Sequence, residues 1–358
     1  MAAMRFFSEE DVSRLVDIHD AIEAVEEAFR LAARGEASNR PRERVAASGP
    51  ARPAGFAGSA QGQAPSSRAH TRTWLHIMPA AMEVPGVVGF KAYVSGPSGS
   101  RFMVFLFDAA SGEPLAALEA GKLGQLRTGA ASAVASRRMA RPDSRVMVMF
   151  GCGWQASTQL LALTAVLPLR RVWVVGRRPG SAEAFCERMR PLVGEVELRP
   201  LVGGATGSAD VERAVGEADV VTTITTSREP VLLGRWLRPG THVNAAGSNH
   251  PARQELDAEA VLRAERVVVD DLEQARRESG DLIAAEPRGF DWARALPLAG
   301  VVAGQLPGRL SQEEVTLFES QGVALEDVAL AARVVAKAER TGAAVRRVEP
   351  PLWGGLDR

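Results

Sequence analysis

The sequence has few of the features that would tie a protein to an oxidising compartment, a membrane or nucleic acid. Only two cysteines, Cys152 and Cys186, occur in 358 residues, so we expect no disulfide framework and a reducing compartment, the cytoplasm. Lys+Arg and Asp+Glu balance at 43 each, which gives no charge-based support for nucleic acid or an anionic membrane as a partner. No stretch approaches the ~18 uninterrupted apolar residues of a membrane span, and the first residues contain no apolar signal core.

What is present is the composition of an ordinary soluble enzyme. Hydrophobic residues make up 46% of the chain and charged residues 24%. The length favours two domains over one, and no internal repeats are visible.

The first third predicts a helix, a loop and a group of strands. Ser8 and Asp11 resemble a capping box, apolar residues then recur at helical spacing, and Gly35 is placed to end the helix. Residues 45–69 are rich in Ala, Gly, Pro, Ser and Gln, and we expect a mobile loop or flap there. Short turns then separate apolar runs, which favours an antiparallel sheet. The predicted strands are 73–78, 87–95, 102–107 and 114–119, and a helix is predicted over 125–139.

From Arg145 the pattern changes to alternating strands and helices, which is typical of a doubly wound parallel sheet. Residues 325–340 are again helical in pattern, and we expect the chain from 315 to 358 to return to the N-terminal domain. The predicted fold is α/β, with a Rossmann domain at 129–314 inserted into an α+β domain made of 1–128 and the C-terminal segment. The predicted strands of the Rossmann domain are 146–150, 171–175, 196–198, 220–223, 242–245 and 267–269.

A glycine-rich segment between the first predicted strand and helix of this domain carries the cofactor prediction. Gly151-Cys-Gly153-Trp-Gln-Ala156 is a GxGxxA fingerprint of dinucleotide binding, with alanine allowed at the third position. Gly151 would permit the tight turn, and Gly153 would let the backbone approach the pyrophosphate at the helix N-terminus. A structural turn could give the same pattern, but its place between a strand and a helix favours a cofactor site.

The end of the second strand bears on the choice between NAD and NADP. The segment after Val175 reads Gly-Arg177-Arg178-Pro and lacks the acid that usually binds the ribose hydroxyls of NAD. Two guanidinium groups can stack on adenine and pair with a 2′-phosphate, so we expect NADP(H) to be preferred, with NAD(H) possible. Alternatively, both arginines are simply solvated. Thr223 and Thr225, at a later strand end, are further cofactor candidates, although threonine is also a common strand residue.

Several segments together resemble the ornithine cyclodeaminase/mu-crystallin family, which includes archaeal alanine dehydrogenases and ketimine or imino acid reductases. The resemblance spans roughly Arg42 to Asp327. It implies a homodimer whose sheet is formed by the domain made from both chain ends. The segments are Gly89-Phe-Lys91, Leu126-Arg-Thr-Gly129, Gly151-Cys-Gly-Trp-Gln-Ala156, Val221-Thr-Thr-Ile-Thr225, His242-Val-Asn-Ala-Ala-Gly247 with Pro251 and Glu255, and Thr316-Leu-Phe-Glu-Ser320.

The resemblance assigns roles to several cationic side chains. The family's substrate-binding lysine matches Lys91, and its carboxylate-binding arginine matches Arg127. A lysine on an apolar strand must be paired, functional or at a solvated edge, because burying an unpaired ammonium is costly. A second family arginine matches Arg44 or Arg42, and we prefer Arg44. The further residues expected at the cofactor are Thr128, Trp154, Gln155, Ala246, Gly247, Ser320 and Gly322, of which the last two could also be capping and turn residues.

The sequence departs from the family after the Asn-Ala-x-Gly turn. Cyclodeaminases and alanine dehydrogenases of the family have a catalytic aspartate where this chain has Asn249. An amide cannot act as a carboxylate base, so the departure argues against a faithful ornithine cyclodeaminase. His250 could supply the acid–base function, or could be an ordinary turn residue.

We therefore expect an NAD(P)H-dependent oxidoreductase that acts on the C–N bond of a small amino or imino acid, as an imino acid reductase or an amino acid dehydrogenase. Lys91, alone or with His250, would transfer the proton, and no metal is expected. One alternative is an ornithine or lysine cyclodeaminase that releases ammonia and recycles its NAD. Another is a non-catalytic NADP-binding protein, like the crystallins of the family.

Overall fold

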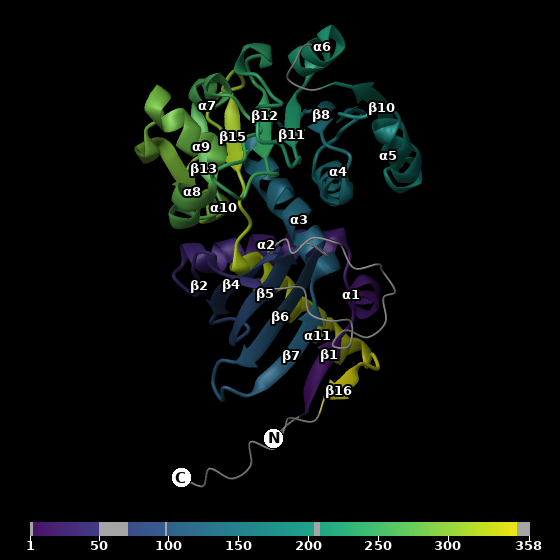
Figure 1. Ribbon diagram of the computed structural model, residues 1–358, viewed down its shortest axis with the longest axis vertical. Coiled ribbons are helices and arrows are strands. Elements are labelled where there is room, and N and C mark those ends of the chain that lie inside the picture. The colour runs from purple at the N-terminus through teal and green to yellow at the C-terminus, as the bar shows by residue number, and fades with distance from the viewer. Residues whose placement is uncertain (1–2, 50–70, 97–98, 204–207, 349–358) are drawn as a thin grey trace.

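The computed structural model describes residues 3–49, 71–96, 99–203 and 208–348, which fold around two eight-stranded sheets (Figure 1). The first, the mixed sheet, has the order β16-β1-β7-β6-β5-β4-β2, and β3 also pairs with β4. All its pairings are antiparallel except β1 with β7. Its strands are β1 (Met4–Phe7), β2 (Ala37–Asn39), β3 (Glu43–Gly49), β4 (Thr71–Met82), β5 (Val87–Gly96), β6 (Gly99–Asp108), β7 (Pro114–Glu119) and β16 (Arg346–Val348).

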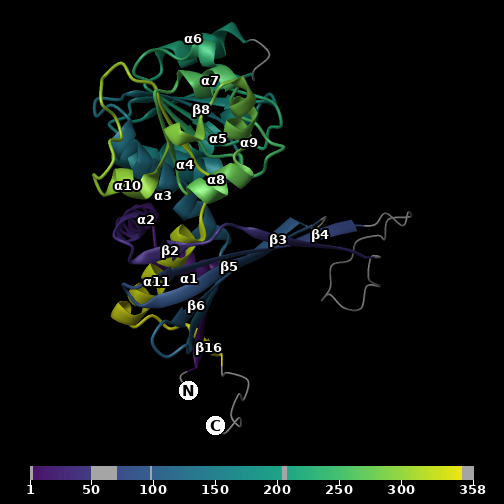
Figure 2. The ribbon, with the colours of Figure 1, turned by 90° about the vertical axis from the view of Figure 1, so that its left-hand side faces the viewer.

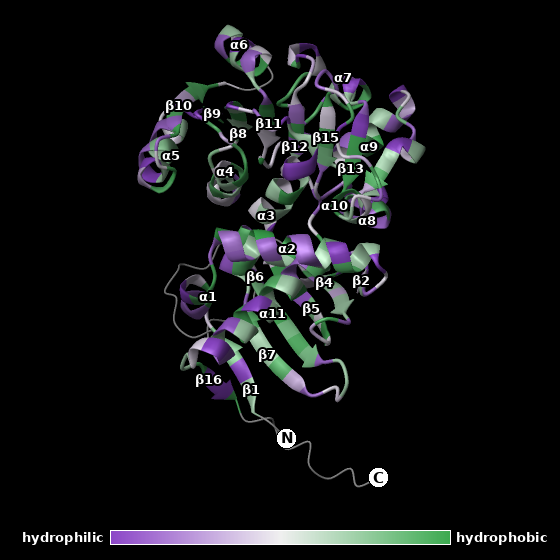
Figure 3. Cartoon of the chain, turned by 180° about the vertical axis from the view of Figure 1, so that it is seen from behind, coloured by the Kyte–Doolittle hydropathy of each residue, from purple (hydrophilic) through white to green (hydrophobic). Residues whose placement is uncertain are grey.

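Helices cover one face of the mixed sheet. Seen from behind, α2 and α11 lie across it, over strands that are largely hydrophobic (Figure 3). The capping box of Ser8 and Asp11 is present at the first helix, as predicted. In the side view, β3 and β4 extend beyond the rest of this sheet (Figure 2). The helices of this part are α1 (Glu9–Leu15), α2 (Ile18–Ala33) and α11 (Ala324–Thr341).

The second sheet, the parallel sheet, has the order β10-β9-β8-β11-β12-β15-β13-β14 and only parallel pairings. Because the order runs outward in both directions from β8, this is the predicted doubly wound Rossmann sheet. Its strands are β8 (Val146–Phe150), β9 (Arg171–Gly176), β10 (Glu197–Val202), β11 (Val220–Thr223), β12 (His242–Ala245), β13 (Arg266–Val269), β14 (Ala295–Pro297) and β15 (Thr316–Glu319). Its helices are α4 (Trp154–Val166), α5 (Ser181–Met189), α6 (Ala209–Glu217), α7 (Ala258–Arg263), α8 (Leu272–Glu278), α9 (Gly280–Ala285) and α10 (Leu298–Val302), with 3-10 turns at Arg190–Leu192, Gly234–Trp236, Glu286–Arg288 and Trp292–Arg294.

A buried helix, α3 (Gly121–Met139), joins the two sheets (Figure 1). Small residues line it, and a Cβ on Gly129 would come within 2.3 Å of the Thr158 carbonyl oxygen on α4. The glycine therefore lets α3 and α4 pack closely. This contact matters for function, since α3 carries Arg127 and α4 begins in the glycine-rich segment.

Three predictions need correction or limits. Residues 45–49 belong to β3 and not to a loop, and residues 50–69 of the predicted flap lie outside the described ranges. The predicted return of the chain at residue 315 is too early, because β15 lies between β12 and β13 in the parallel sheet. Helix α3 crosses the predicted boundary at residues 128 and 129. Within the described ranges, no helix is both long and apolar enough to cross a bilayer.

Candidate active site

The glycine-rich segment forms the turn from β8 into α4. Gly151 has φ +112°, and a Cβ there would lie 2.5 Å from the Ile224 carbonyl oxygen, so only glycine fits. Gly153 is the N-cap of α4, and a Cβ there would meet nothing within 4 Å. The space in front of Gly153 and the free amides of the first helical turn suit a phosphate group. The sequence prediction of a turn between strand and helix is thus confirmed in its geometry.

A cavity of about 350 Å³ adjoins this turn. Nine of the residues expected at the cofactor line it, and so do Arg127 and Asn249. Thr223, Gly151 and Ala156 are not among its lining residues, and Arg177 and Arg178 are exposed in the loop after β9. The nine expected residues in its lining are Thr128, Gly153, Trp154, Gln155, Thr225, Ala246, Gly247, Ser320 and Gly322.

One buried carboxyl group holds the far wall of this cavity in place. Glu255 accepts hydrogen bonds from the Thr223 hydroxyl (3.0 Å), the Thr225 amide (2.5 Å) and the Gly247 amide (2.7 Å). Burial, together with the nearby Asp281, raises the pKa of Glu255 to about 7, while the hydrogen bonds from the two threonines oppose the rise. Thr223 therefore supports the wall through Glu255 and does not line the cavity.

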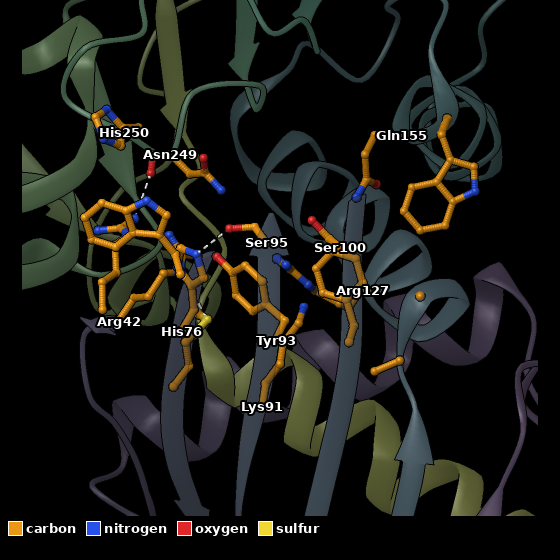
Figure 4. Close-up of a pocket in the computed structure, with 18 of the residues that line it drawn as sticks. Arg42, His76, Lys91, Tyr93, Ser95, Ser100, Arg127, Gln155, Asn249 and His250 are labelled. Carbon is orange, nitrogen blue, oxygen red and sulfur yellow. Dashed lines mark hydrogen bonds between the residues drawn. The ribbon is translucent and has the colours of Figure 1, made fainter. Parts of the chain in front are cut away.

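A second cavity, of about 440 Å³, lies beside the first, over the ends of β4, β5 and β6 (Figure 4). We call it the substrate pocket. Residues Arg127, Trp154, Gln155, Asn249 and Arg253 line both cavities, so the two adjoin. Among the described residues that line the substrate pocket there is no aspartate or glutamate. Its cationic lining residues are Arg42, Arg44, Lys91, Arg127 and Arg253.

Lys91 is buried on β5, with 3% of its surface exposed. Its Nζ donates to Asp327 Oδ1 at 2.9 Å, from the first turn of α11. Burial lowers the pKa of Lys91 to about 8, although Asp327 opposes the shift, and Arg127 adds to it. A Cβ on Gly124 would lie 3.1 Å from the same nitrogen, so α3 leaves just enough room for the ammonium. Lys91 is therefore a fixed cation with a pKa near the working range of an acid catalyst.

Arg127, on α3, lies beside the same pair of acids. It contacts Glu326 at 2.9 Å and Asp327 at 3.3 Å. Burial opposes ionisation of Arg127, but these carboxylates raise its pKa. Burial also raises the pKa of Glu326 to about 8, against the effect of Arg127. Gly322 has φ +72°, and a Cβ there would lie 2.1 Å from an Arg127 nitrogen, so this glycine makes room for the guanidinium group.

Both candidates for the second arginine line the pocket, and they share one acid, Glu278. Arg42 is buried, pairs with Glu278 and donates to the carbonyl oxygens of Gln321 (3.1 Å) and Gly322 (3.2 Å). Arg44 is more exposed, contacts Glu278 at 2.6 Å and donates to the Asn249 carbonyl oxygen at 3.1 Å. The geometry thus brings both arginines to the site, where Arg42 is held by protein groups and Arg44 faces the cavity more openly.

Asn249 lines both cavities, as expected for the position of the family aspartate. His250 also lines the substrate pocket, but it is exposed, and its Nδ1 accepts a hydrogen bond from the Ala252 amide at 3.1 Å. Partial burial, followed by the positive charge of Arg44, lowers the pKa of His250. His250 is therefore mainly neutral at pH 7 and has a turn hydrogen bond of its own.

The sequence analysis missed the acids that hold the cations and a second histidine in the pocket. Asp327, Glu326 and Glu278 are buried and come from α11 and α8, far along the chain from their partners. His76 lines the pocket on β4, stacked on Tyr93 with ring centroids 4.1 Å apart. The two adjacent acids in the first turn of the alanine-rich helix α11 were the one signal in the sequence.

The parallel sheet and its glycine turn define a Rossmann-type dinucleotide-binding protein, and a pocket lined by cations adjoins the turn. The chain belongs to the ornithine cyclodeaminase/mu-crystallin family, whose model matches residues 3–342. The resemblance inferred from the sequence segments is therefore confirmed.

Relatives with names and structures agree with this assignment. The chain is 33% identical to alanine dehydrogenase of Archaeoglobus fulgidus over 333 residues, 90% of this chain and 92% of the relative. The structure of Thermococcus litoralis Δ(1)-pyrroline-2-carboxylate reductase with NADH and L-proline has a TM-score of 0.82 at 31% identity, covering 96% of this chain and 100% of the other. That of Paracoccus denitrificans iminosuccinate reductase with NAD+ has a TM-score of 0.81 at 28% identity, covering 97% and 100%.

Proposed function

We propose that the protein is an NAD(P)H-dependent oxidoreductase that reduces an imino acid to an amino acid, or oxidises the amino acid in reverse. The observation that carries this proposal is the pair of buried cations, Lys91 and Arg127, in a pocket that adjoins the dinucleotide turn. The named relatives act on alanine, pyrroline-2-carboxylate and iminosuccinate. These names support the reaction class and leave the substrate side chain open.

The cationic side chains would bind and orient the substrate. Arg127 and Lys91 would hold the α-carboxylate, since a guanidinium group suits a carboxylate and both cations are already fixed by acids. Arg44 completes the set of cations that face the substrate. A bound nicotinamide would supply or accept the hydride, and the residues around Gly153, Thr225 and Gly247 would hold the dinucleotide.

We assign the proton transfer at the substrate nitrogen to Lys91. Only three lysines, Lys91, Lys122 and Lys337, occur among the 43 Lys+Arg residues of the chain. An arginine cannot give up its proton in a protein, whereas a buried lysine can. A lysine with a pKa of about 8, in a chain that otherwise uses arginine, fits a donor of protons better than a purely electrostatic group. The exposed His250 is a weaker candidate, and Asn249 would orient and not ionise.

NADP(H) is the proposed cofactor, with NAD(H) as the alternative. Arg177 and Arg178 support this choice, because they follow β9, where the adenosine ribose binds in Rossmann domains. Both are exposed, so neither guanidinium group is buried in the protein. The bound cofactors named for the two similar structures are NADH and NAD+, so the preference requires a direct measurement.

A homodimer is proposed from the uncovered face of the mixed sheet. Along β3, β4 and β5, alternate side chains face the pocket, and those between them point to the opposite face of the sheet, away from the helices. Several large apolar side chains on that opposite face are more than a third exposed. Apolar surface of this kind on a sheet indicates an interface. We expect a dimer by light scattering, and a monomer or loss of solubility for Leu75→Glu. The exposed apolar residues are Val45, Leu75, Ile77, Val88 and Val94.

The two other functions suggested by the family are less well supported. A cyclodeaminase must bind a substrate with a second amine, and no carboxylate among the described lining residues would pair with it. A non-catalytic binding protein would have no need of a lysine with a lowered pKa.

The deciding experiment measures NADPH and NADH oxidation with cyclic ketimines and with 2-oxo acids plus ammonia, and NAD(P) reduction with amino acids. Turnover with net cofactor conversion is expected. Ammonia release from ornithine or lysine without net conversion would support the cyclodeaminase. Saturable cofactor binding without any turnover would support the binding protein.

A further inference from the structure

The floor of the substrate pocket is a grid of side chains on neighbouring strands. Strand register places Met78 opposite Lys91, and this first row also contains Arg42, which contacts the Met78 sulfur. The second row lies two residues further along each strand and contains Arg44, His76, Tyr93 and Phe102. The third row contains Trp74, Ser95 and Ser100. Successive rows lie about 7 Å apart along the strands.

The first two rows differ in how their cations are balanced. Lys91 and Arg127 lie beside two acids, Asp327 and Glu326. Arg44 has only a share in Glu278, which Arg42 also contacts. In the described part of the chain, Arg44 makes no other ion pair. The two guanidinium groups therefore have one carboxylate between them, and the second row has a positive charge facing the cavity.

We infer that the substrate has a second carboxylate, which Arg44 binds one row away from the α-carboxylate held at Lys91 and Arg127. This inference rests on the proposed function and specifies its substrate class, a four- or five-carbon dicarboxylic imino acid. The backbone of such a compound is of the length needed to reach from the first row toward the second, with the flexible Arg44 side chain covering the remainder.

His76 gives independent support, because it is buried beside Arg44 with an unsatisfied ring nitrogen. Its exposed fraction is 8%, its Nε2 is 2.9 Å from the Ser95 hydroxyl, and its Nδ1 has no hydrogen-bond partner among the described residues. Burial, and then the charges of Arg44 and Arg42, lower the pKa of His76 to about 4. The ring is thus neutral and can donate one hydrogen bond to an oxygen of the ligand. Leaving such a nitrogen unpaired costs free energy, which a ligand oxygen would remove.

The aromatic rings fix this second row. Tyr93, the only tyrosine in the chain, stacks on His76 at an interplanar angle of 4° and lies 5.1 Å from the Phe102 ring. Figure 4 shows Tyr93 between His76 on one side and Arg127 on the other. An ammonium group on the substrate side chain would meet Arg44, and the described lining residues include no acid to pair with it, so the row discriminates by charge as well as by shape.

The first test compares matched 2-oxo acids, each with ammonia and NADPH or NADH. The pairs are 2-oxoglutarate with 2-oxopentanoate, and oxaloacetate with 2-oxobutanoate, which differ by one terminal carboxylate. We expect kcat/KM to be about 10- to 100-fold higher for the better dicarboxylate than for its partner, the range of one charge-assisted hydrogen-bonded pair. Equal or better turnover of both monocarboxylates would overturn the inference and leave the proposed function intact.

The second test removes the charge of Arg44. Arg44→Gln should reduce the dicarboxylate preference by about 10-fold or more. The matched control is Arg277→Gln, which removes an exposed guanidinium group that contacts Glu43 on the neighbouring position of β3 at 3.1 Å. That control should keep the preference. If Arg44→Gln lowers kcat/KM equally for the dicarboxylate and the monocarboxylate of each pair, Arg44 holds the α-carboxylate and the inference is overturned.

Binding is measured separately from turnover. In the wild type, 2-oxoglutarate should raise the melting temperature more than 2-oxopentanoate does, and Arg44→Gln should abolish this difference. That result would support the second carboxylate site even if no turnover were found and the proposed function failed. His76→Phe, which keeps a stacked ring without the nitrogen, should reduce the same difference, and no change in both variants would count against the site.

Discussion

The cofactor cavity and the substrate pocket adjoin, yet they are lined by different types of residue. The cofactor cavity is lined mainly by glycines, small residues and hydroxyl groups, and its partners are backbone amides. The substrate pocket is lined by five cations and aromatic rings, and acids hold four of these cations from behind. A dinucleotide would thus be bound by backbone amides at a helix N-terminus. A small anion would be bound by charged side chains that are already oriented.

This difference has an energetic consequence. Removing a side chain from the cofactor cavity changes its shape, whereas removing one from the pocket leaves a buried charge without its partner. Substitutions in the pocket should therefore act on catalysis most strongly, and substitutions at the cofactor cavity should act on binding.

The largest effect is expected for Lys91→Ala. It removes the proton donor and leaves Asp327 with Arg127 as its remaining partner. We expect kcat to fall by about 10³-fold, within the range of lost acid–base catalysis. Cofactor affinity, measured by fluorescence titration, should change little. A similar loss of cofactor affinity would show that the two cavities are not separate in function.

The next effect distinguishes the two glycines of the turn. Gly151→Ala places a Cβ against the Ile224 carbonyl at a positive φ, so it should destabilise the protein by about 2 kcal/mol and weaken cofactor binding. Gly153→Ala has open space, so the melting temperature should stay within about 2 °C, while the dinucleotide Kd rises by about 10-fold because its phosphate loses that space. Unchanged cofactor binding in Gly153→Ala would place the pyrophosphate elsewhere.

The cofactor cavity could be predicted from the sequence better than the substrate pocket could. The parallel sheet and the glycine turn were predictable because the strand, turn and helix are consecutive, from Val146 to Val166. Lys91 and Arg127 were predicted from the resemblance to the family's motifs, and Lys91 also from its place on an apolar strand. Their acids were not predicted, because Asp327 lies 236 residues from Lys91. Such pairings depend on how α11 packs on β5 and α3. No local pattern encodes that packing, and the same holds for β15, which the sequence placed outside the parallel sheet.

The pH dependence of reduction should report the environment of Lys91. Because its pKa is lowered to about 8, the protonated donor predominates below pH 8 and is lost above it. We expect kcat for reduction to be level below this pH and to fall by about 10-fold per pH unit above it. Asp327→Asn removes a charge that raises this pKa, so the break should move to lower pH.

Glu326 provides the control for that profile, since its pKa is also raised to about 8. Glu326→Gln should keep the break near pH 8 if Lys91 is responsible. A break that disappears in Glu326→Gln and stays in place in Asp327→Asn would assign the titration to Glu326 and remove the argument for Lys91 as the proton donor.

The smallest effect is expected at the exposed arginines after β9. Arg177 and Arg178 make no side-chain ion pair within the described residues, so their replacement should leave stability unchanged. An exposed ion pair contributes about 0.2–1 kcal/mol, so Arg177→Gln with Arg178→Gln should raise the KM for NADPH by about 2- to 5-fold and leave that for NADH unchanged. The control is Arg199→Gln, another exposed arginine, on β10, which pairs with Glu197 at 2.5 Å. If the wild type has equal KM values for NADPH and NADH and the double substitution does not change them, the two arginines are solvated surface. The proposed NADP preference would then be wrong, while the proposal for the substrate pocket would be unaffected.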